Sequence, residues 1–138
     1  MSRPGWDKYF LGICAAVAER ADCTRRKVGA VIVNDHRIVS TGYNGAPAGH
    51  RGCLTDGACP RGRMTKEEVL PGSSYDTGPG SCIGLHAEQN AVIYGDYGKM
   101  RHGIIYVTDY PCAGCLRMIA GAGLLRIVTP LGQFDIPR

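Results

Sequence analysis

The sequence has few Trp and Phe residues and carries little net charge. Its 138 residues include one Trp and two Phe, and its formal net charge is only +4. A protein that holds nucleic acid strands needs a basic surface with aromatic side chains for base stacking, so this composition argues against a nucleic acid partner. A small anionic ligand suits a mild positive charge better.

Long apolar runs are also missing. No stretch is long enough to cross a bilayer, and the opening MSRPGWDKYF lacks the continuous apolar segment of a secretory signal. We therefore expect a cytoplasmic protein with no membrane partner. The seven cysteines are an odd number, and in a reducing compartment they stay thiols. Thiols at short spacings then point to metal binding.

Hydrophobic periodicity predicts a single domain over residues 1–138 in which helices and strands alternate. The expected elements are a helix at 6–17, strands at 28–33 and 37–41, a helix at 85–94, a strand at 104–108, a helix at 113–122 and a strand at 125–128. Asn34-Asp35-His36 is the expected turn of a hairpin, and the tail after Pro130 is expected to be irregular. Such an order predicts an α/β fold with a partly parallel sheet.

The segment 43–81 is an insertion rich in Gly and Pro. Thr65 and Glu68 form a capping-box pattern, which predicts one short helix from Thr65. A loop this long inside a compact domain is usually functional or is held together by other means.

Two short motifs bear on chemistry, His86-Ala87-Glu88 and Pro111-Cys112-Ala113-Gly114-Cys115. Cys112 and Cys115 share one side of a predicted helix start, where the partial positive charge of the helix favours thiolates. His86 begins another predicted helix and supplies an imidazole. Two thiolates and one imidazole are three zinc ligands, and they leave a fourth position for water, as in catalytic zinc sites.

Glu88 is placed near the predicted metal without being a ligand. Zinc lowers the pKa of its bound water, and the Glu88 carboxylate would move that proton to the ring nitrogen and then to the leaving ammonia. The pattern His-x-Glu followed by Pro-Cys-x-x-Cys is the known signature of zinc nucleobase deaminases. A structural zinc remains the alternative interpretation, because other cysteines are available as a fourth ligand.

These motifs resemble those of the cytidine and deoxycytidylate deaminase superfamily, above all its deoxycytidylate branch. The resemblance covers nearly the whole chain and includes Arg3-Pro4-Gly5-Trp6-Asp7, Val28-Gly29-Ala30-Val31-Ile32-Val33, Gly42-Tyr43-Asn44-Gly45, His86-Ala87-Glu88-Gln89-Asn90-Ala91 and Tyr106-Val107-Thr108 before Pro111-Cys112. It implies a three-layer α/β/α fold with a mixed five-stranded sheet. It also implies hydrolysis of a pyrimidine nucleotide, best dCMP to dUMP plus ammonia, which feeds thymidylate synthesis.

The resemblance further implies zinc on His86, Cys112 and Cys115, with Glu88 as the proton shuttle. It implies that Asn44 hydrogen-bonds the sugar or base of the substrate. For Asn44 the alternative is a turn residue in the left-handed conformation, which Asn tolerates.

Relatives are often hexamers, and many are activated by dCTP and inhibited by dTTP at a second nucleotide site near the Gly-Tyr-Asn-Gly turn. Arg25, Arg26 and Lys27 lie just before the first predicted strand. Together with Tyr43 and Gly45 they are the candidates for such an allosteric site. The alternative for the three cations is a solvated basic turn.

Four cysteines lie outside the catalytic motif: Cys23, Cys53, Cys59 and Cys82. They suffice for a second, structural zinc that ties down the long loop, with His50 as an alternative ligand. Some phage relatives are similar here and carry a second zinc on cysteines near the positions of Cys23 and Cys53. The spacing from Cys53 to Cys59 departs from the usual two-residue spacing, so four ordinary thiols are the alternative.

Two other functions stay open. One is a deaminase acting on another substrate, such as dCTP, a nucleoside or a nucleic-acid base. The other is a non-catalytic, zinc-stabilised binding protein, against which the intact Glu88 argues. Free-cytidine deaminases usually carry a cysteine where His86 stands. Arg61, Arg63 and Lys66 are candidates for holding a phosphate, with solvent-facing charges as the alternative.

Overall fold

A mixed five-stranded sheet organises the chain, and the computed structural model describes residues 2–136. The strands are β1 Gly29–Asn34, β2 Arg37–Tyr43, β3 Ile104–Val107, β4 Arg126–Thr129 and β5 Gly132–Asp135. Their order in the sheet is β2-β1-β3-β4-β5. The pair β3 and β4 is parallel, and the other neighbouring strands are antiparallel. The mixed sheet implied by the family resemblance is therefore confirmed.

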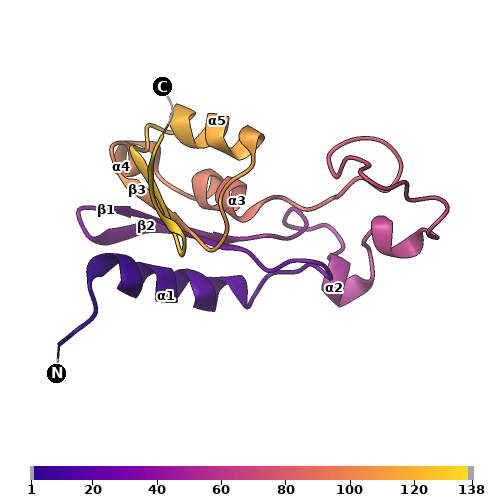
Figure 1. Cartoon of the computed structure of the whole chain (residues 1–138), viewed down its shortest axis with the longest axis horizontal. Helices are drawn as coiled ribbons and strands as arrows, with labels where there is room; N and C mark the ends of the chain where they lie inside the picture. The colour runs from indigo at the N-terminus through magenta and orange to yellow at the C-terminus, as the bar shows by residue number, and fades with distance from the viewer. Residues whose placement is uncertain (1, 137–138) are drawn as a thin grey trace.

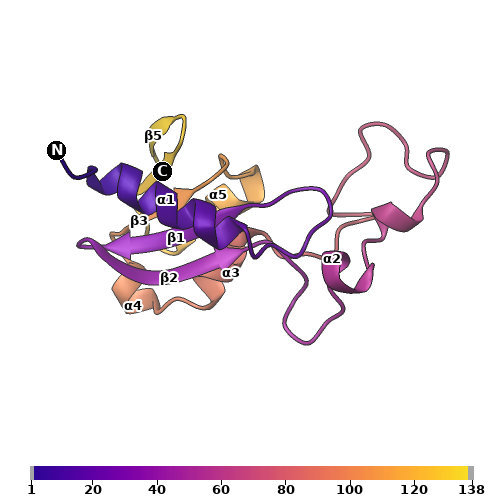
Figure 2. The same cartoon turned by 90° about the horizontal axis from the view of Figure 1, so that it is seen from below.

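Helices cover both faces of this sheet and give three layers (Figure 1; Figure 2). Helix α1, Trp6–Ala18, lies on one face. The other face carries α3 Ala87–Ile93, α4 Tyr97–Met100 and α5 Ala113–Gly121. Among the described residues, none of the helices combines the length and the apolar character that a membrane span needs.

The strand β1 shows why both faces must be covered. Ala30 and Ile32 belong to the core under α3 and α5, whereas Val31 and Val33 belong to the core under α1. All four side chains are buried. Successive strand residues point to opposite faces, so a strand buried on both sides needs a continuous apolar run. Burial of each Val or Ile stabilises the fold by about 1.5–3 kcal/mol.

The predicted hairpin turn is confirmed. Asp35 and His36 have φ angles of 50° and 60°, the left-handed conformation that a two-residue hairpin turn requires. The Trp6 ring stacks on the His36 ring with centroids 4.1 Å apart. The hairpin tip is thereby fixed to the start of α1.

The prediction of an irregular tail after Pro130 was wrong, because β5 adds a fifth strand there. Thr129 pairs with Gly132, and the strand continues antiparallel to β4 as far as Asp135 opposite Arg126. The segment Gly132–Asp135 is short and has a single large apolar side chain, Phe134. Such an edge strand gives little sequence signal, because its stability comes from pairing with β4 rather than from its own pattern.

The helix predicted from Thr65 was also wrong. Residues 66–68 form only a turn, in which the Glu68 N–H donates to the Thr65 hydroxyl at 3.3 Å. Pro71 follows closely and disfavours the helical conformation of the residue before it. Too few residues are left to offset the cost of starting a helix.

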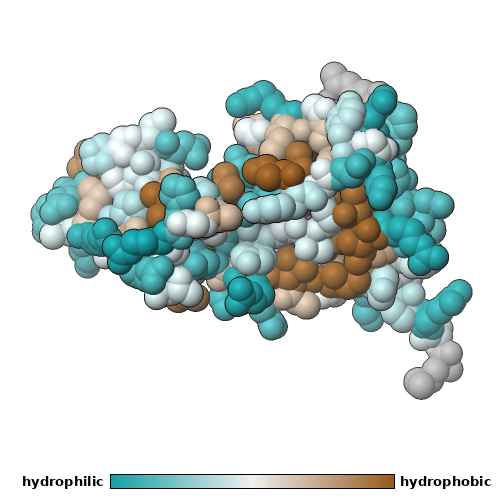
Figure 3. Space-filling model, turned by 180° about the vertical axis from the view of Figure 1, so that it is seen from behind, coloured by the Kyte–Doolittle hydropathy of each residue, from teal (hydrophilic) through white to brown (hydrophobic). Residues whose placement is uncertain are grey.

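The segment between β2 and α3 projects from the sheet as a lobe (Figure 1; Figure 2). Within it lie the short helix α2, Cys53–Asp56, and a single 3₁₀ turn, Arg61–Arg63. On the face seen in Figure 3 the lobe is largely hydrophilic, whereas apolar side chains gather over the sheet and its helices. In residues 44–86 the buried apolar side chains are Cys53 and Ala58. The lobe therefore lacks an apolar core of its own.

Candidate active site

The N-terminus of α3 positions His86. His86 is the residue that caps this helix, and its N–H donates to the Gln89 side chain at 2.7 Å. Just before it, Leu85 and Gly45 exchange two backbone hydrogen bonds of 2.7 and 3.1 Å. The chain therefore enters α3 in a fixed direction.

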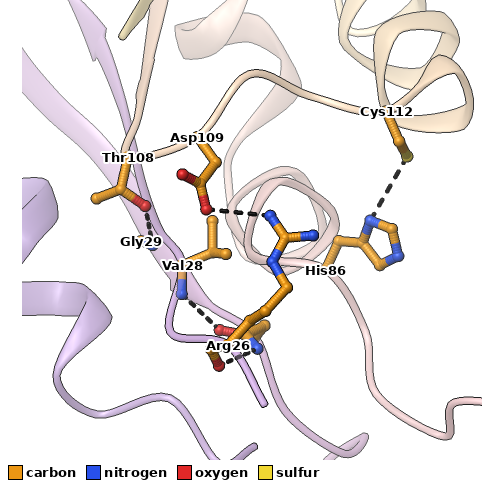
Figure 4. Close-up of polar contacts among 8 residues, drawn as sticks. Arg26, Val28, Gly29, His86, Thr108, Asp109 and Cys112 are labelled. Atoms are coloured by element: carbon orange, nitrogen blue, oxygen red, sulfur yellow. Dashed lines mark hydrogen bonds and ion pairs between the residues drawn. The ribbon is translucent and has the colours of Figure 1, made fainter. Parts of the chain in front are cut away.

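The N-terminus of α5 supplies the two thiols. Cys112 caps this helix and Cys115 lies in its first turn, with Cys112 exposed and Cys115 buried. The His86 Nδ1 atom lies 3.6 Å from the Cys112 Sγ and 3.3 Å from the Cys115 Sγ. Figure 4 shows the His86 ring directed at Cys112.

These three residues fit a zinc ion. Their ligand atoms all lie within 4.8 Å of one another. Among the His, Cys, Asp and Glu residues of the described range 2–136, this is the one group of three that lies so close together. Zinc–sulfur bonds of about 2.3 Å and zinc–nitrogen bonds of about 2.0 Å at tetrahedral angles separate N and S by roughly 3.5 Å. The observed separations of 3.6 and 3.3 Å match this value.

Glu88 lies in the first turn of α3, next to the three ligands, and is only 4% exposed. Burial raises the pKa of its carboxyl group, and the nearby positive charge of Arg26 opposes that rise. Burial also raises the pKa of the Cys115 thiol, as do the charges of Glu88 and Cys112. A bound cation would reverse this effect on the thiol, because a coordinating thiol is deprotonated.

Asn44 holds the segment that leads into β1. Its Oδ1 accepts a hydrogen bond from the Val28 N–H at 2.8 Å, and its Nδ2 donates to the Arg26 carbonyl at 3.0 Å. The left-handed turn conformation was the alternative for this residue, and Asn44 is not among the described non-glycine residues with positive φ. The Asn44 side chain lines the same cavity as His86 and Glu88.

That cavity has a volume of about 480 Å³ and runs from His86 and Cys112 to the lobe. Its charged lining includes two residues that face each other across the mouth, Arg26 and Asp109. The Arg26 Nη2 lies 3.0 Å from the Asp109 Oδ2 (Figure 4). Asp109 and its neighbour Tyr110, which also lines the cavity, were not among the residues predicted from the sequence. Their position directly before Pro111-Cys112 is the signal that would have identified them.

The other phosphate candidates are placed differently. Arg61 lines the cavity but is buried, and its Nη2 donates to the carbonyls of Ser73 and Ser74 at 2.9 and 2.7 Å. Arg63 and Lys66 are exposed and do not belong to the cavity lining.

The structure divides the five allosteric candidates. Arg25 and Arg26 line the catalytic cavity. Tyr43 lines a separate hollow of about 420 Å³ on the other side of the Gly-Tyr-Asn-Gly turn, and Gly45 borders both spaces. Lys27 is exposed and borders neither.

The four remaining candidate ligands, Cys23, Cys53, Cys59 and Cys82, all line the catalytic cavity at its lobe end. Two of their sulfurs accept backbone hydrogen bonds at 3.3 Å: the Arg25 N–H donates to Cys23 and the Gly84 N–H donates to Cys82. No three of the four sulfurs lie within 4.8 Å of one another among the described residues. His50 is exposed and outside the cavity lining.

Electrostatics link these four thiols. Burial raises the pKa of Cys53 to about 11, and the charges of Cys59, Cys82 and Cys23 add to this rise. The pKa of Cys59 is lowered, against the effect of burial, by hydrogen bonds from the backbone of Gly62, the side chain of Thr24, the backbone of Arg61 and the side chain of Arg25. The thiols are close enough to repel one another when ionised.

Comparisons with known proteins agree with this geometry. The family model of the cytidine and deoxycytidylate deaminase zinc-binding region matches residues 4–130. The deoxycytidylate deaminase of Mycobacterium phage D29 is 50% identical over 131 residues, which are 94% of this chain and 98% of the phage protein. That of Schizosaccharomyces pombe is 37% identical over 91% of this chain, which spans only 37% of the yeast protein.

A solved structure is similar over nearly the whole chain. It is the dCMP deaminase from the cyanophage S-TIM5 in complex with dCMP and dUMP, with 26% identity and a TM-score of 0.67. The similarity covers 94% of this chain and 83% of the cyanophage chain. The chain belongs to the cytidine and deoxycytidylate deaminase family, whose zinc-binding region it contains.

Proposed function

We propose that this protein is a zinc-dependent hydrolase that converts dCMP to dUMP and ammonia. The observation that carries the proposal is the buried Glu88 carboxyl beside the His86, Cys112 and Cys115 group, at the end of a cavity large enough for a nucleotide. The deoxycytidylate deaminases among its relatives and the dCMP complex of the cyanophage protein support dCMP as the substrate. The reaction would feed thymidylate synthesis, and a cytoplasmic location stays a prediction.

The proposed mechanism assigns the proton transfers to Glu88. His86, Cys112 and Cys115 would hold the zinc, which when bound lowers the pKa of water so that hydroxide is available near neutral pH. Burial raises the pKa of the Glu88 carboxyl group, which makes it a better proton acceptor than an exposed carboxylate. Glu88 would take a proton from the attacking water and give it to the ring nitrogen of the base, and would then take the proton of the newly formed hydroxyl group and give it to the amino group, which leaves as ammonia. Asn44 is the residue proposed to contact the sugar or base.

The test is ammonia release by zinc-loaded protein from dCMP, dCTP, deoxycytidine, CMP and a short single-stranded DNA. Glu88→Gln should lower turnover of dCMP by roughly 10²–10⁴-fold while zinc content stays the same. Glu67→Gln, an exposed carboxylate of the lobe, is the matched control. Turnover of another substrate alone would overturn the assignment to dCMP. A zinc-loaded protein inactive on all five would favour the non-catalytic binding protein.

The lobe carries a second proposal, a structural zinc on Cys23, Cys53, Cys59 and Cys82. The lobe has no apolar core, and small units without such a core commonly depend on metals or disulfides. Backbone N–H groups donate to two of the sulfurs, and the mutual repulsion of the four thiolates would be relieved by a divalent cation. Zinc binding would draw the four sulfurs together around one ion.

Metal analysis of fully loaded protein tests this second zinc. We expect two zinc ions per chain in the wild type and one in Cys59→Ser. The variant Cys14→Ser is the matched control, because Cys14 lies on the buried face of α1, away from both cysteine groups. One zinc per chain in the wild type would refute the proposal.

We further propose regulation by dCTP and dTTP in a homo-oligomer, with a hexamer as the expected assembly. The hollow that contains Tyr43 also contains Arg20, whose guanidinium lies 5.9 Å from the centre of the Tyr43 ring. Ile93, Tyr94 and Tyr97 are exposed beside it at the end of α3 and the start of α4, as in a subunit interface. Sedimentation analysis tests the assembly. Unchanged rates when dCTP or dTTP is added at low dCMP would refute the regulation.

A further inference from the structure

The ion pair between Arg26 and Asp109 stands at the mouth of the catalytic cavity. It joins the segment before β1 to the loop that leads into Cys112, and it is the one salt bridge found among residues 2–136. Both side chains are largely exposed, at 65% and 51%. Figure 4 shows the Arg26 guanidinium between Asp109 and His86.

Arg26 differs from the other arginines of the cavity because its guanidinium is free to change partners. Arg61 is buried, hydrogen-bonded to two carbonyls and stacked 4.1 Å from the centre of the Tyr75 ring. The backbone N–H of Arg25 donates to the Cys23 sulfur at 3.3 Å, among the cysteines at the lobe end of the cavity. The Arg26 guanidinium, in contrast, is paired with an exposed carboxylate, and such exposed ion pairs contribute little to stability.

The backbone of Arg26 is fixed, whereas its side chain is exposed. The Asn44 amide donates to the Arg26 carbonyl, and Asn44 also accepts from the Val28 N–H. The guanidinium is therefore held within reach of the cavity without a committed partner inside it.

We propose that Arg26 binds the 5′-phosphate of the nucleotide and that Asp109 is its partner only while the cavity is empty. A phosphate dianion offers a guanidinium two parallel charge-assisted hydrogen bonds, which a single exposed carboxylate contact does not match. Binding exchanges the Asp109 carboxylate for the phosphate. Asp109 then discriminates against ligands without a phosphate, because only a dianion displaces it. The inference rests on the proposed deamination of a nucleotide.

The test compares ligands with and without the phosphate. Arg26→Gln should raise the KM for dCMP and the Kd for dUMP by roughly 10- to 100-fold, the range of a charged hydrogen bond. The Kd for deoxyuridine and the kcat for dCMP should change little. A residue that merely supports the fold would weaken dUMP and deoxyuridine alike. Because Arg26 is exposed, its loss should leave thermal unfolding unchanged.

Asp109→Asn provides an independent readout. Removal of the competing carboxylate should lower the Kd for dUMP, by up to about 5-fold for an exposed pair. In protein that already carries Arg26→Gln, Asp109→Asn should lower the Kd for dUMP less, because only the general loss of one negative charge then acts. The effects of the two substitutions on this Kd should therefore not be additive. Additive effects would overturn the exchange of partners.

Arg25→Gln is the matched control, because Arg25 lines the same cavity one residue earlier. It should leave the preference for dUMP over deoxyuridine intact. If Arg25→Gln removes that preference and Arg26→Gln does not, the inference is wrong while the proposed function stands. If the wild type deaminates no nucleotide and binds dUMP no better than deoxyuridine, both fail together.

Discussion

Gly42 in β2 should be among the positions least tolerant of substitution, because α3 rests directly on it. A Cβ atom at Gly42 would lie 3.0 Å from the Ala91 Cα and still closer to the Ala87 carbonyl oxygen and the Ala91 nitrogen. All three are backbone atoms of α3, so no side-chain rotation relieves the clash. The Gly42 φ lies outside the left-handed region, which leaves steric overlap as the whole effect.

We expect Gly42→Ala to lower the free energy of unfolding by about 3 kcal/mol, at the upper end of overpacking costs. For a chain of this size that corresponds to roughly 10 °C in Tm. The helix that must shift begins at His86 and carries Glu88, and a misplacement of about 1 Å can cost about 10²-fold in rate. Urea unfolding and the turnover of dCMP measure the two effects.

Gly12→Ala is the control for this prediction. Gly12 lies within α1 and is exposed, and a Cβ atom added there would meet nothing within 4 Å. Alanine at this position should stabilise the protein by about 0.5–1 kcal/mol through its higher helix propensity. If Gly42→Ala behaved like Gly12→Ala in both assays, the close packing of α3 on β2 would be refuted.

Single contacts carry three further predictions. Ser40→Ala should lower the free energy of unfolding by about 1 kcal/mol in urea titrations, because the buried Ser40 hydroxyl donates to the Ala91 carbonyl at 2.6 Å; an unchanged value would contradict this. Cys112→Ser should lose the catalytic zinc in metal analysis yet keep its circular dichroism spectrum, since Cys112 is exposed; full zinc retention would contradict the ligand assignment. Burial, then the hydrogen bond to Asp7, raises the pKa of Tyr106, so the unfolded chain ionises first and stability falls as the pH rises above about 10. Tyr106→Phe should cost about 1 kcal/mol at pH 8 and remove part of the alkaline loss, and parallel stability curves for the two proteins from pH 8 to 11 would refute the shift.

The sequence alone predicted those helices and strands whose hydrophobic pattern matches their burial in the folded chain. The run at 28–33 predicted a strand buried on both faces, and β1 is that strand within one residue. The structure also places the predicted helix starts at His86 and Cys112, because a cap is a local feature. These two helix starts lie side by side because α3 and α5 share one face of the sheet. Their closeness brings the three candidate ligand atoms within 4.8 Å of one another.

The remaining features depend on partners far away in the chain. The strand β5 exists because β4 is beside it, and its own four residues have no strand pattern. The pair of Arg26 and Asp109 joins residues 83 positions apart. Arg26 and Asp109 each lie beside a recognisable segment, but nothing in the sequence pairs them, so only the folded chain reveals that they meet.

Asn44 lines the cavity and also holds the backbone that leads into β1. The ladder between β1 and β2 ends at Gly29 opposite Tyr43, one step before Asn44. Beyond it the Asn44 N–H still donates to the Val28 carbonyl at 3.4 Å, and the Asn44 side chain adds two hydrogen bonds, from the Val28 N–H and to the Arg26 carbonyl. One amide hydrogen stays available to a ligand, because a side-chain amide has two. An aspartate at this position would still accept the hydrogen bond from the Val28 N–H, but it has no N–H to donate to the Arg26 carbonyl. The Arg26 backbone would then lose this hydrogen bond, while β1 would keep its pairing with β2. The need for both an acceptor and a donor at this point therefore explains why an amide stands at the wall of the cavity.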